Sequence, residues 1–127
     1  MPRPESRIAK EYGPRAFALA AAAAIVFCLF WLGSKPYAGQ LFLPPWDKLA
    51  HVAVYGALAI LLWIGTGARD PLGVVVAVLM VGVLDELHQA ALPGRTADLA
   101  DIFADACGIG AAFLLLRGRR PAMKGDP

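Results

Sequence analysis

Charged residues are scarce in this 127-residue chain, at 17%, whereas 58% of its residues are hydrophobic. Soluble domains usually contain about 25% charged and about 45–50% apolar residues. The apolar content excludes a disordered chain, and two cysteines are too few for a disulfide scaffold. A net charge of +2 also disfavours a strongly basic nucleic-acid binder. The composition therefore predicts a small integral membrane protein.

Four apolar stretches are separated by short polar segments. A membrane-spanning helix needs about 17–25 residues. The sequence thus predicts spans at about 16–33, 47–65, 71–92 and 98–116. The expected fold is all-α, a polytopic four-transmembrane-helix bundle that forms a single domain over residues 1–127, with basic tails at 1–15 and 117–127. The first span is predicted to be an uncleaved anchor, because it is longer than a signal-peptide core and three more spans follow.

Helix-breaking and capping residues support these limits. The Pro-Pro pair at 44–45 disfavours helix directly before the second span. Asp70 followed by Pro71 is typical of an N-cap with proline at the first helical position. Pro93 and Gly94 are expected to end the third helix and to leave a short hairpin before the fourth.

Basic residues predict the orientation. Nine of the twelve lie at the termini or between the second and third spans. They are Arg3, Arg7, Lys10, Arg15, Arg69, Arg117, Arg119, Arg120 and Lys124. By the positive-inside rule both termini are predicted to be cytoplasmic, and the 1–2 and 3–4 loops to face outward.

Acidic residues are concentrated at the opposite ends of the helices. Apart from Asp70 in the 2–3 loop, the six acids between residues 46 and 107 lie there, and so do both histidines. The alternating helix directions bring the start of the second, the end of the third and the start of the fourth helix to one outer layer. Three segments far apart in sequence are therefore expected to meet there.

Residue spacing predicts which side chains share a face. On the second helix Asp47, His51 and Tyr55 recur every four residues, and on the third Glu86 and Gln89 are three apart.

The fourth helix carries Asp98, Asp101 and Asp105 along one stripe. Asp105 lies about 9 Å beyond the start of this span, so it is expected below the headgroups. An acid at mid-bilayer costs about 2.5–3.5 kcal/mol on the insertion scale, which favours side chains that face one another. A buried polar pocket that opens outward is therefore predicted.

The polar segments, taken together, resemble the VanZ-like family, named for an accessory protein of teicoplanin resistance. They read DKLAH at 47–51, DELHQ at 85–89, PGR at 93–95 and DLAD at 98–101. The resemblance extends over residues 47–110 and implies a small multi-spanning protein of the bacterial cytoplasmic (inner) membrane, with a poorly defined activity. It marks as functional Asp47, Lys48, His51, Tyr55, Glu86, Gln89, Arg95 and Asp101. Many relatives carry asparagine where this chain has Asp105.

The first functional hypothesis is that the pocket binds, or acts on, an anionic cell-envelope component. This would be a lipid-linked phosphate or a peptidoglycan-precursor group. Arg95 and Lys48 would hold the anion. The catalytic candidates are His51, Glu86 and Asp101, with histidine paired to Glu86 or Asp47 as acid or base. The ligand-binding candidates are Asp47, Lys48, Tyr55, Gln89, Arg95 and Asp105.

Two further hypotheses remain open. A metal ion is one, with His51, Glu86, Asp101 and Asp105 as its ligands. The other is a non-enzymatic bundle, either linked to protons or ions or assisting a partner membrane protein. The sequence leaves the cofactor, the partner protein and the presence of catalysis undetermined, and it offers no support for nucleic-acid binding.

Several of these residues also have a purely structural interpretation. Asp47 and Asp98 are candidate helix N-caps. Lys48 and Arg95 are candidate interfacial cations whose charged ends reach the headgroups. His88 is a candidate interfacial residue, whereas Tyr55 lies deep enough to favour an internal hydrogen bond.

Overall fold

A computed structural model describes residues 4–117, with side chains from Tyr12 onward. It contains four long helices and one short 3-10 helix, and the described residues form no strand. The elements are α1 (Pro4–Gly33), η1 (Ala38–Gln40), α2 (Trp46–Gly65), α3 (Pro71–Ala90) and α4 (Leu99–Arg117). Each long helix has a stretch long and apolar enough to cross a membrane, beginning at Tyr12 in α1. The predicted all-α fold with four spans is confirmed.

The helix starts follow from local chemistry. The Asp70 carboxylate accepts a hydrogen bond from the Gly73 N–H at 2.8 Å, which confirms the predicted cap of α3. Helix α2 begins directly after the Pro-Pro pair, and its N-cap is Pro45. The interpretation of Asp47 as an N-cap is therefore wrong. Asp47 lies within the first turn and makes no capping hydrogen bond, so its carboxylate is left for other contacts.

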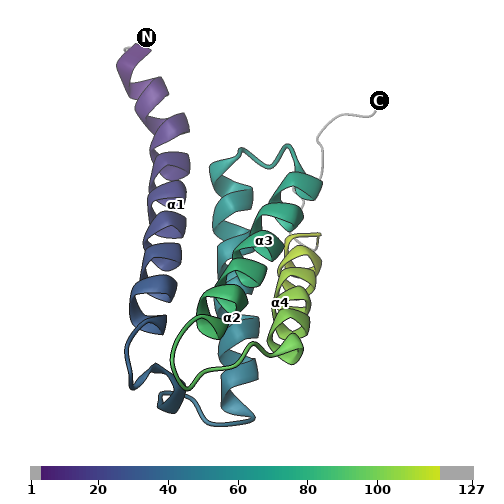
Figure 1. The fold of residues 1–127 in the computed structure, drawn as a ribbon. Coiled ribbons are helices and arrows are strands. Elements are labelled where there is room, and N and C mark those ends of the chain that lie inside the picture. The colour runs from purple at the N-terminus through teal and green to yellow at the C-terminus, as the bar shows by residue number, and fades with distance from the viewer. Residues whose placement is uncertain (1–3, 118–127) are drawn as a thin grey trace.

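Helices α2, α3 and α4 pack together, and α1 lies alongside them (Figure 1). The start of α1, the α2–α3 connection and the end of α4 lie at one end of the bundle. The connections 34–45 and 91–98 lie at the other end, which we call the loop end. The predicted C-terminal tail beyond Arg117 lies outside the described residues.

Two glycines allow α2 and α4 to pack closely. A Cβ atom on Gly56 would lie 3.0 Å from the Gly108 carbonyl oxygen, and one on Gly108 would collide with the carbonyl oxygen of Val52. The two backbones therefore touch where a larger residue would separate them. By contrast, a Cβ on Gly110 of the same helix would meet no atom within 4 Å.

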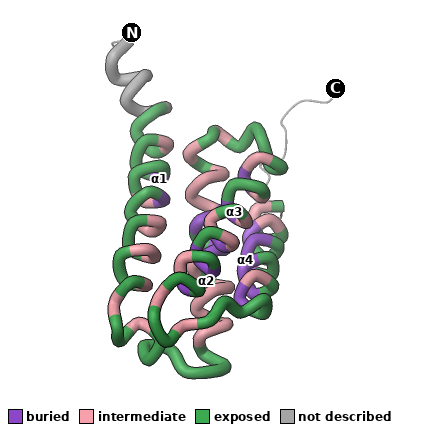
Figure 2. Tube along the Cα trace, in the orientation of Figure 1, coloured by how far each residue is buried: buried purple, intermediate pink, exposed green. Residues whose placement is uncertain are grey.

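The apolar core lies among the four long helices, on the side of the polar residues that faces away from the loop end (Figure 2). Tyr55, Leu58 and Val78 are fully buried in it. Large apolar side chains such as Leu99 and Phe103 are instead more than 70% exposed and point away from the bundle. An apolar exterior around a small core is the arrangement expected of a protein surrounded by lipid.

Candidate functional site

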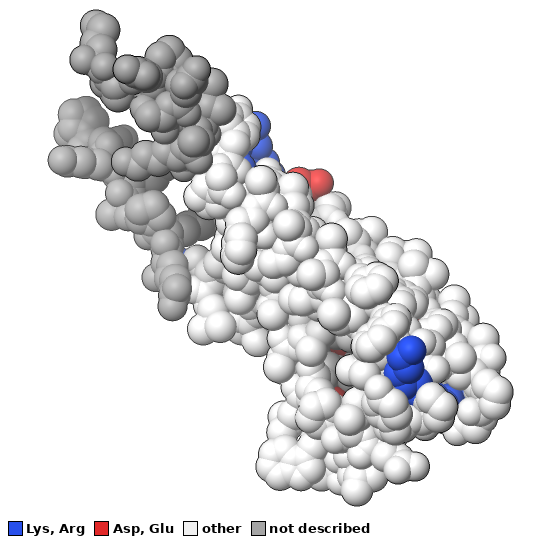
Figure 3. All heavy atoms as spheres, turned by 90° about the vertical axis from the view of Figure 1, so that its left-hand side faces the viewer, with Lys and Arg blue, Asp and Glu red and all other residues white. Residues whose placement is uncertain are grey.

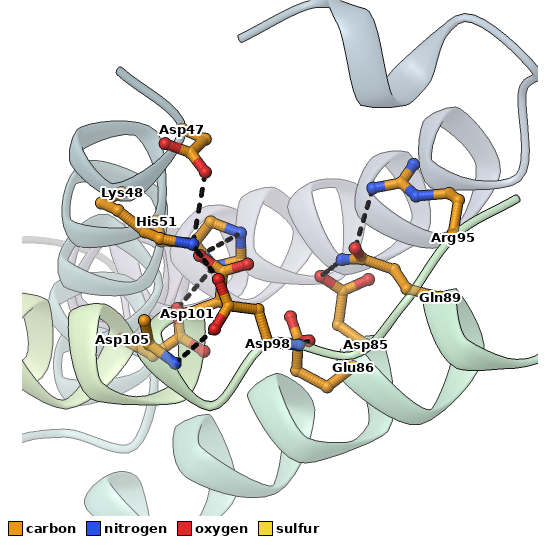
Figure 4. Close-up of polar contacts among 11 residues, drawn as sticks. Asp47, Lys48, His51, Asp85, Glu86, Gln89, Arg95, Asp98, Asp101 and Asp105 are labelled. Carbon is orange, nitrogen blue, oxygen red and sulfur yellow. Dashed lines mark hydrogen bonds and ion pairs between the residues drawn. The ribbon is translucent and has the colours of Figure 1, made fainter. Parts of the chain in front are cut away.

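Polar side chains from α2, α3, α4 and the α3–α4 connection converge at the loop end (Figure 4). Five of these are acidic or amide side chains with less than a tenth of their surface exposed. They are Asp85, Glu86, Gln89, Asp101 and Asp105. The convergence predicted from helix direction is therefore present in the fold.

His51 and Asp105 form the deepest contact of this group. The His51 Nδ1–H donates to the Asp105 carboxylate at 2.8 Å, and Asp105 is completely buried. The other Asp105 oxygen faces Gly82 of α3 so closely that a Cβ there would collide with it. Glycine at position 82 thus makes room for the carboxylate that orients the histidine ring.

Lys48 is surrounded by three carboxylates. Its ammonium lies 3.2 Å from Asp47, 2.6 Å from Asp98 and 2.5 Å from Asp101. The predicted role of Lys48 as an anion clamp is therefore not supported, because its charge is already balanced. The lysine instead holds the start of α2 against the start of α4.

Asp98 confirms the predicted N-cap of α4. One of its carboxylate oxygens accepts from the Ala100 N–H at 2.9 Å, and the other accepts from Lys48. The hydrogen bond from Lys48, followed by that from Ala100, holds the pKa of the Asp98 carboxyl below its ordinary value. Asp98 therefore remains a charged partner of Lys48 under mildly acidic conditions.

A second chain of hydrogen bonds connects the α3–α4 connection to α3. The Arg95 guanidinium donates to the Gln89 side-chain oxygen at 2.8 Å, and the Gln89 amide donates to Asp85 at 3.0 Å. A second guanidinium nitrogen donates to the backbone carbonyl of Gly33 at the end of α1. Among the described residues Arg95 forms no ion pair with a carboxylate, in contrast to Lys48.

Five buried polar atoms of this layer have no hydrogen-bond partner among the described residues. They are Asp47 Oδ1, Glu86 Oε1, Asp105 Oδ2, His88 Nδ1 and the hydroxyl of Tyr55. The other Glu86 oxygen accepts from the Asp98 backbone N–H at 2.6 Å. Tyr55 stacks on the His51 ring with the centroids 5.7 Å apart, and its hydroxyl lies near Asp85 without a hydrogen bond of ordinary geometry. A buried polar group without a hydrogen bond costs free energy, so a bound ion or ligand at these atoms would stabilise the protein.

His88, near the end of α3, contacts α1. Its ring packs against Phe30 of α1 with the centroids 5.3 Å apart, and its Nδ1 has no described hydrogen-bond partner. The ring therefore helps to hold α1 against α3.

A cavity of about 530 Å³ opens beside these residues. Its polar lining includes His51, Tyr55, Asp85, Gln89 and Arg95. The facing wall is apolar and comes from α1 and from the segment around η1. It is lined by Ala24, Ile25, Cys28, Leu29, Leu32, Leu41 and Phe42. Figure 3 shows this side of the molecule, with acidic atoms visible inside a hollow whose rim is largely uncharged.

The residues best placed to hold a metal ion differ from the predicted set. One ligand atom each of His51, Asp85 and Glu86 lies within 4.8 Å of the other two. Asp101 is bonded to Lys48, and Asp105 is bonded to the histidine itself.

The candidates from the sequence therefore separate into groups. The structure brings Asp47, Tyr55, Gln89, Arg95 and Asp101 to the lining of one cavity with His51, while Glu86 and Asp105 lie in the protein beside it. Asp85 was missing from the predicted site, although its four-residue spacing from Gln89 places both on one face. The Gly33 carbonyl was missed too, and no sequence signal marks it.

A sequence model of the family described as VanZ/LLP1 matches residues 10–120, which include all four spans. The chain belongs to the VanZ/LLP1 family. No curated protein and no solved structure shows significant similarity to it. This VanZ/LLP1 protein is thus a multi-pass membrane protein whose polar layer lies at the loop end.

Proposed function

We propose that this VanZ/LLP1 protein binds a lipid-linked anionic component of the cell envelope in its loop-end cavity. The component would be a polyprenyl-type phosphate or a lipid-linked peptidoglycan-precursor group. The anion would meet Arg95, and its lipid chain would lie along α1. The proposed location is the bacterial cytoplasmic membrane, with the loop end at the outer leaflet and the termini in the cytoplasm.

The observation that carries the proposal is the difference between the two cations of the site. Lys48 is neutralised by three carboxylates, whereas Arg95 lines the cavity and, within the described residues, is hydrogen-bonded to the Gln89 amide and the Gly33 carbonyl alone. A guanidinium fixed by neutral acceptors keeps its full charge, and its planar fork matches a phosphate or carboxylate. An anion that enters the cavity has this side chain as its counter-ion.

The lining of the cavity supports an amphiphile rather than a free anion. Its volume of about 530 Å³ is in the range typical of ligand pockets, about 300–1,000 Å³. The wall from α1 and the η1 segment offers apolar side chains such as Leu29 and Phe42, and the opposite wall is polar. A ligand with a charged head and an apolar chain satisfies both walls.

The site also contains a side chain that could transfer a proton to or from a bound headgroup. His51 has one ring nitrogen committed to Asp105, and its other nitrogen lies 3.8 Å from Asp101 near the cavity. A histidine oriented in this way can take or give a proton. We extend the proposal to glycopeptide resistance, which teicoplanin susceptibility of cells with and without the protein would test.

Equilibrium binding in nanodiscs tests the proposal. A polyprenyl phosphate should bind, and the neutral polyprenol with the same chain should bind at least about tenfold more weakly, because a charge-assisted hydrogen bond contributes about 1.5–3 kcal/mol. Arg95→Ala should abolish this preference. Lys35→Ala is the matched control, since Lys35 stacks on Trp31 outside the cavity lining. Equal affinity for both lipids, or an Arg95→Ala variant that still prefers the phosphate, contradicts the proposal.

A non-enzymatic structural bundle is a second candidate, favoured by the contacts of Lys48 between α2 and α4. It predicts that alanine substitutions at His51, Glu86 and Asp101 lower thermal stability or expression. A ligand site predicts well-folded variants that no longer bind. Melting curves measured beside the binding assay separate the two.

A further inference from the structure

We propose that His51, Asp85 and Glu86 form a binding site for one first-row transition-metal dication such as Mn²⁺ or Zn²⁺. A nitrogen of the histidine and an oxygen of each carboxylate lie within 4.8 Å of one another. All three groups come from the polar ends of α2 and α3. The inference does not rest on the binding of an envelope lipid.

Each of the three proposed ligands is also held in position by a hydrogen bond to a neighbouring residue. The Asp105 carboxylate accepts from His51 Nδ1, which leaves the lone pair of the other ring nitrogen free. A carboxylate in this role is the usual partner of a metal-binding histidine. Gln89 donates to one oxygen of Asp85, and Gln89 is itself held by Arg95.

Glu86 supplies an observation independent of the grouping. It is 3% exposed, and the Asp98 N–H fixes one of its oxygens, but Oε1 has no hydrogen-bond partner within residues 12–117. The buried Tyr55 hydroxyl and the Asp105 Oδ2 likewise have no hydrogen-bond partner within the part of the chain that the structure describes. A buried carboxylate oxygen without a donor is explained by a bound cation, and the water shell of that cation can reach the hydroxyl.

The charge of the layer favours a cation in the same place. Six carboxylates lie there, against the two permanent cations Lys48 and Arg95. The six are Asp47, Asp85, Glu86, Asp98, Asp101 and Asp105. Lys48 is bonded to Asp98 and Asp101 on the α4 side, whereas the described residues place no cation in direct contact with Asp85 or Glu86. A dication between these two side chains neutralises them.

The donor set selects the kind of ion. One imidazole nitrogen with two carboxylates is a mixed set that suits Zn²⁺ or Mn²⁺. Mg²⁺ and Ca²⁺ favour ligands that are all oxygen. The site is therefore expected to discriminate against the latter two ions.

The test uses the full chain, purified in detergent and stripped with a chelator, with no added lipid-linked anion. Titration with Zn²⁺ or Mn²⁺ followed by elemental analysis should give one ion per chain, bound at least about tenfold more tightly than Mg²⁺. Failure to take up either ion stoichiometrically overturns the inference, whatever the result with lipids.

Variants then locate the ion. Glu86→Gln and Asp85→Asn keep the shape of the side chains and should each weaken binding by about 100-fold or more, beyond the roughly 10–100-fold typical of outer hydrogen-bond partners. Asp98→Asn is the matched control, because it removes one negative charge from the same layer and asparagine also caps helices. Its affinity should stay within about threefold of that of the unmodified chain. If all three variants bound the metal equally weakly, affinity would depend only on the net charge of the layer. That result would contradict Asp85 and Glu86 as direct ligands.

Melting curves in the same detergent show which variants remain folded. If one ligand variant does not fold, the other decides the location. If neither folds, the decisive comparison is between unmodified chain and His51→Asn.

Discussion

His51 of α2 donates a 2.8 Å hydrogen bond to Asp105 of α4, a carboxylate with no exposed surface. The pair forms because the glycines at 56 and 108 let the two helices touch, and because the glycine at 82 leaves space for the second carboxylate oxygen. Close backbone packing thus determines the orientation of the one histidine that lines the cavity.

Gly108→Ala should separate α2 from α4. Its new methyl group would collide with the Val52 carbonyl, so we expect a loss of about 1–3 kcal/mol in the free energy of unfolding. Gly110→Ala is the control on the same helix, since its methyl group meets nothing within 4 Å and should leave stability unchanged or higher. Thermal melting in detergent measures both. Equal melting temperatures for the two variants would show that close packing at position 108 is unimportant.

Asp105→Asn should be tolerated, whereas Asp105→Leu should not. The asparagine oxygen can still accept from His51 Nδ1–H, but leucine leaves that donor buried without a partner, at a cost of about 1–3 kcal/mol. The comparison is made by melting curves of the two variants and the unmodified chain. If Asp105→Leu were as stable as Asp105→Asn, a structural role for this hydrogen bond would be contradicted.

Lys48→Gln should lower stability rather than selectively remove anion binding. The substitution leaves Asp47, Asp98 and Asp101 close together without their shared cation. Because the lysine side chain is about a third exposed, the loss should be only about 1 kcal/mol. Melting curves and the polyprenyl phosphate assay are run on the same preparation. If Lys48→Gln lost the preference for the phosphate while its stability stayed unchanged, Lys48 would bind the anion as the sequence predicts.

The orientation in the membrane is tested by cysteine labelling. With Cys28 and Cys107 replaced by alanine, Gln40→Cys lies at the loop end and Arg69→Cys in the α2–α3 connection, and both positions are exposed. A membrane-impermeant maleimide should label Gln40→Cys in intact cells, and Arg69→Cys only after permeabilisation. The reverse pattern would place the cavity at the cytoplasmic face.

The sequence predicts the helices because lipid imposes simple rules. Span length, proline positions and the Asp70 cap are local properties, and α2 and α3 begin where those properties indicate. The convergence of acids at one end also follows, since alternating helix directions and spacing fix it. Helical spacing places Glu86 and Gln89 on one face of α3 without any knowledge of their neighbours.

The contacts within the site could not be predicted from the sequence. Whether Lys48 meets a ligand or three carboxylates depends on the rotation and depth of α4 against α2, which hydropathy does not determine. Asp85 was missed for a related reason, because its role depends on reaching Gln89 and the cavity together. The apolar wall from α1 follows from tertiary packing, as α1 carries no charge along this stretch to mark it.

Identification of the lipids that copurify with the protein tests the central claim most directly. The unmodified chain and Arg95→Ala are extracted from the same membranes under mild detergent, and their bound lipids are compared by mass spectrometry. The account predicts a lipid-linked phosphate or precursor enriched with the unmodified chain and lost from Arg95→Ala, with Lys35→Ala unchanged. The same lipid profile for all three proteins would contradict it.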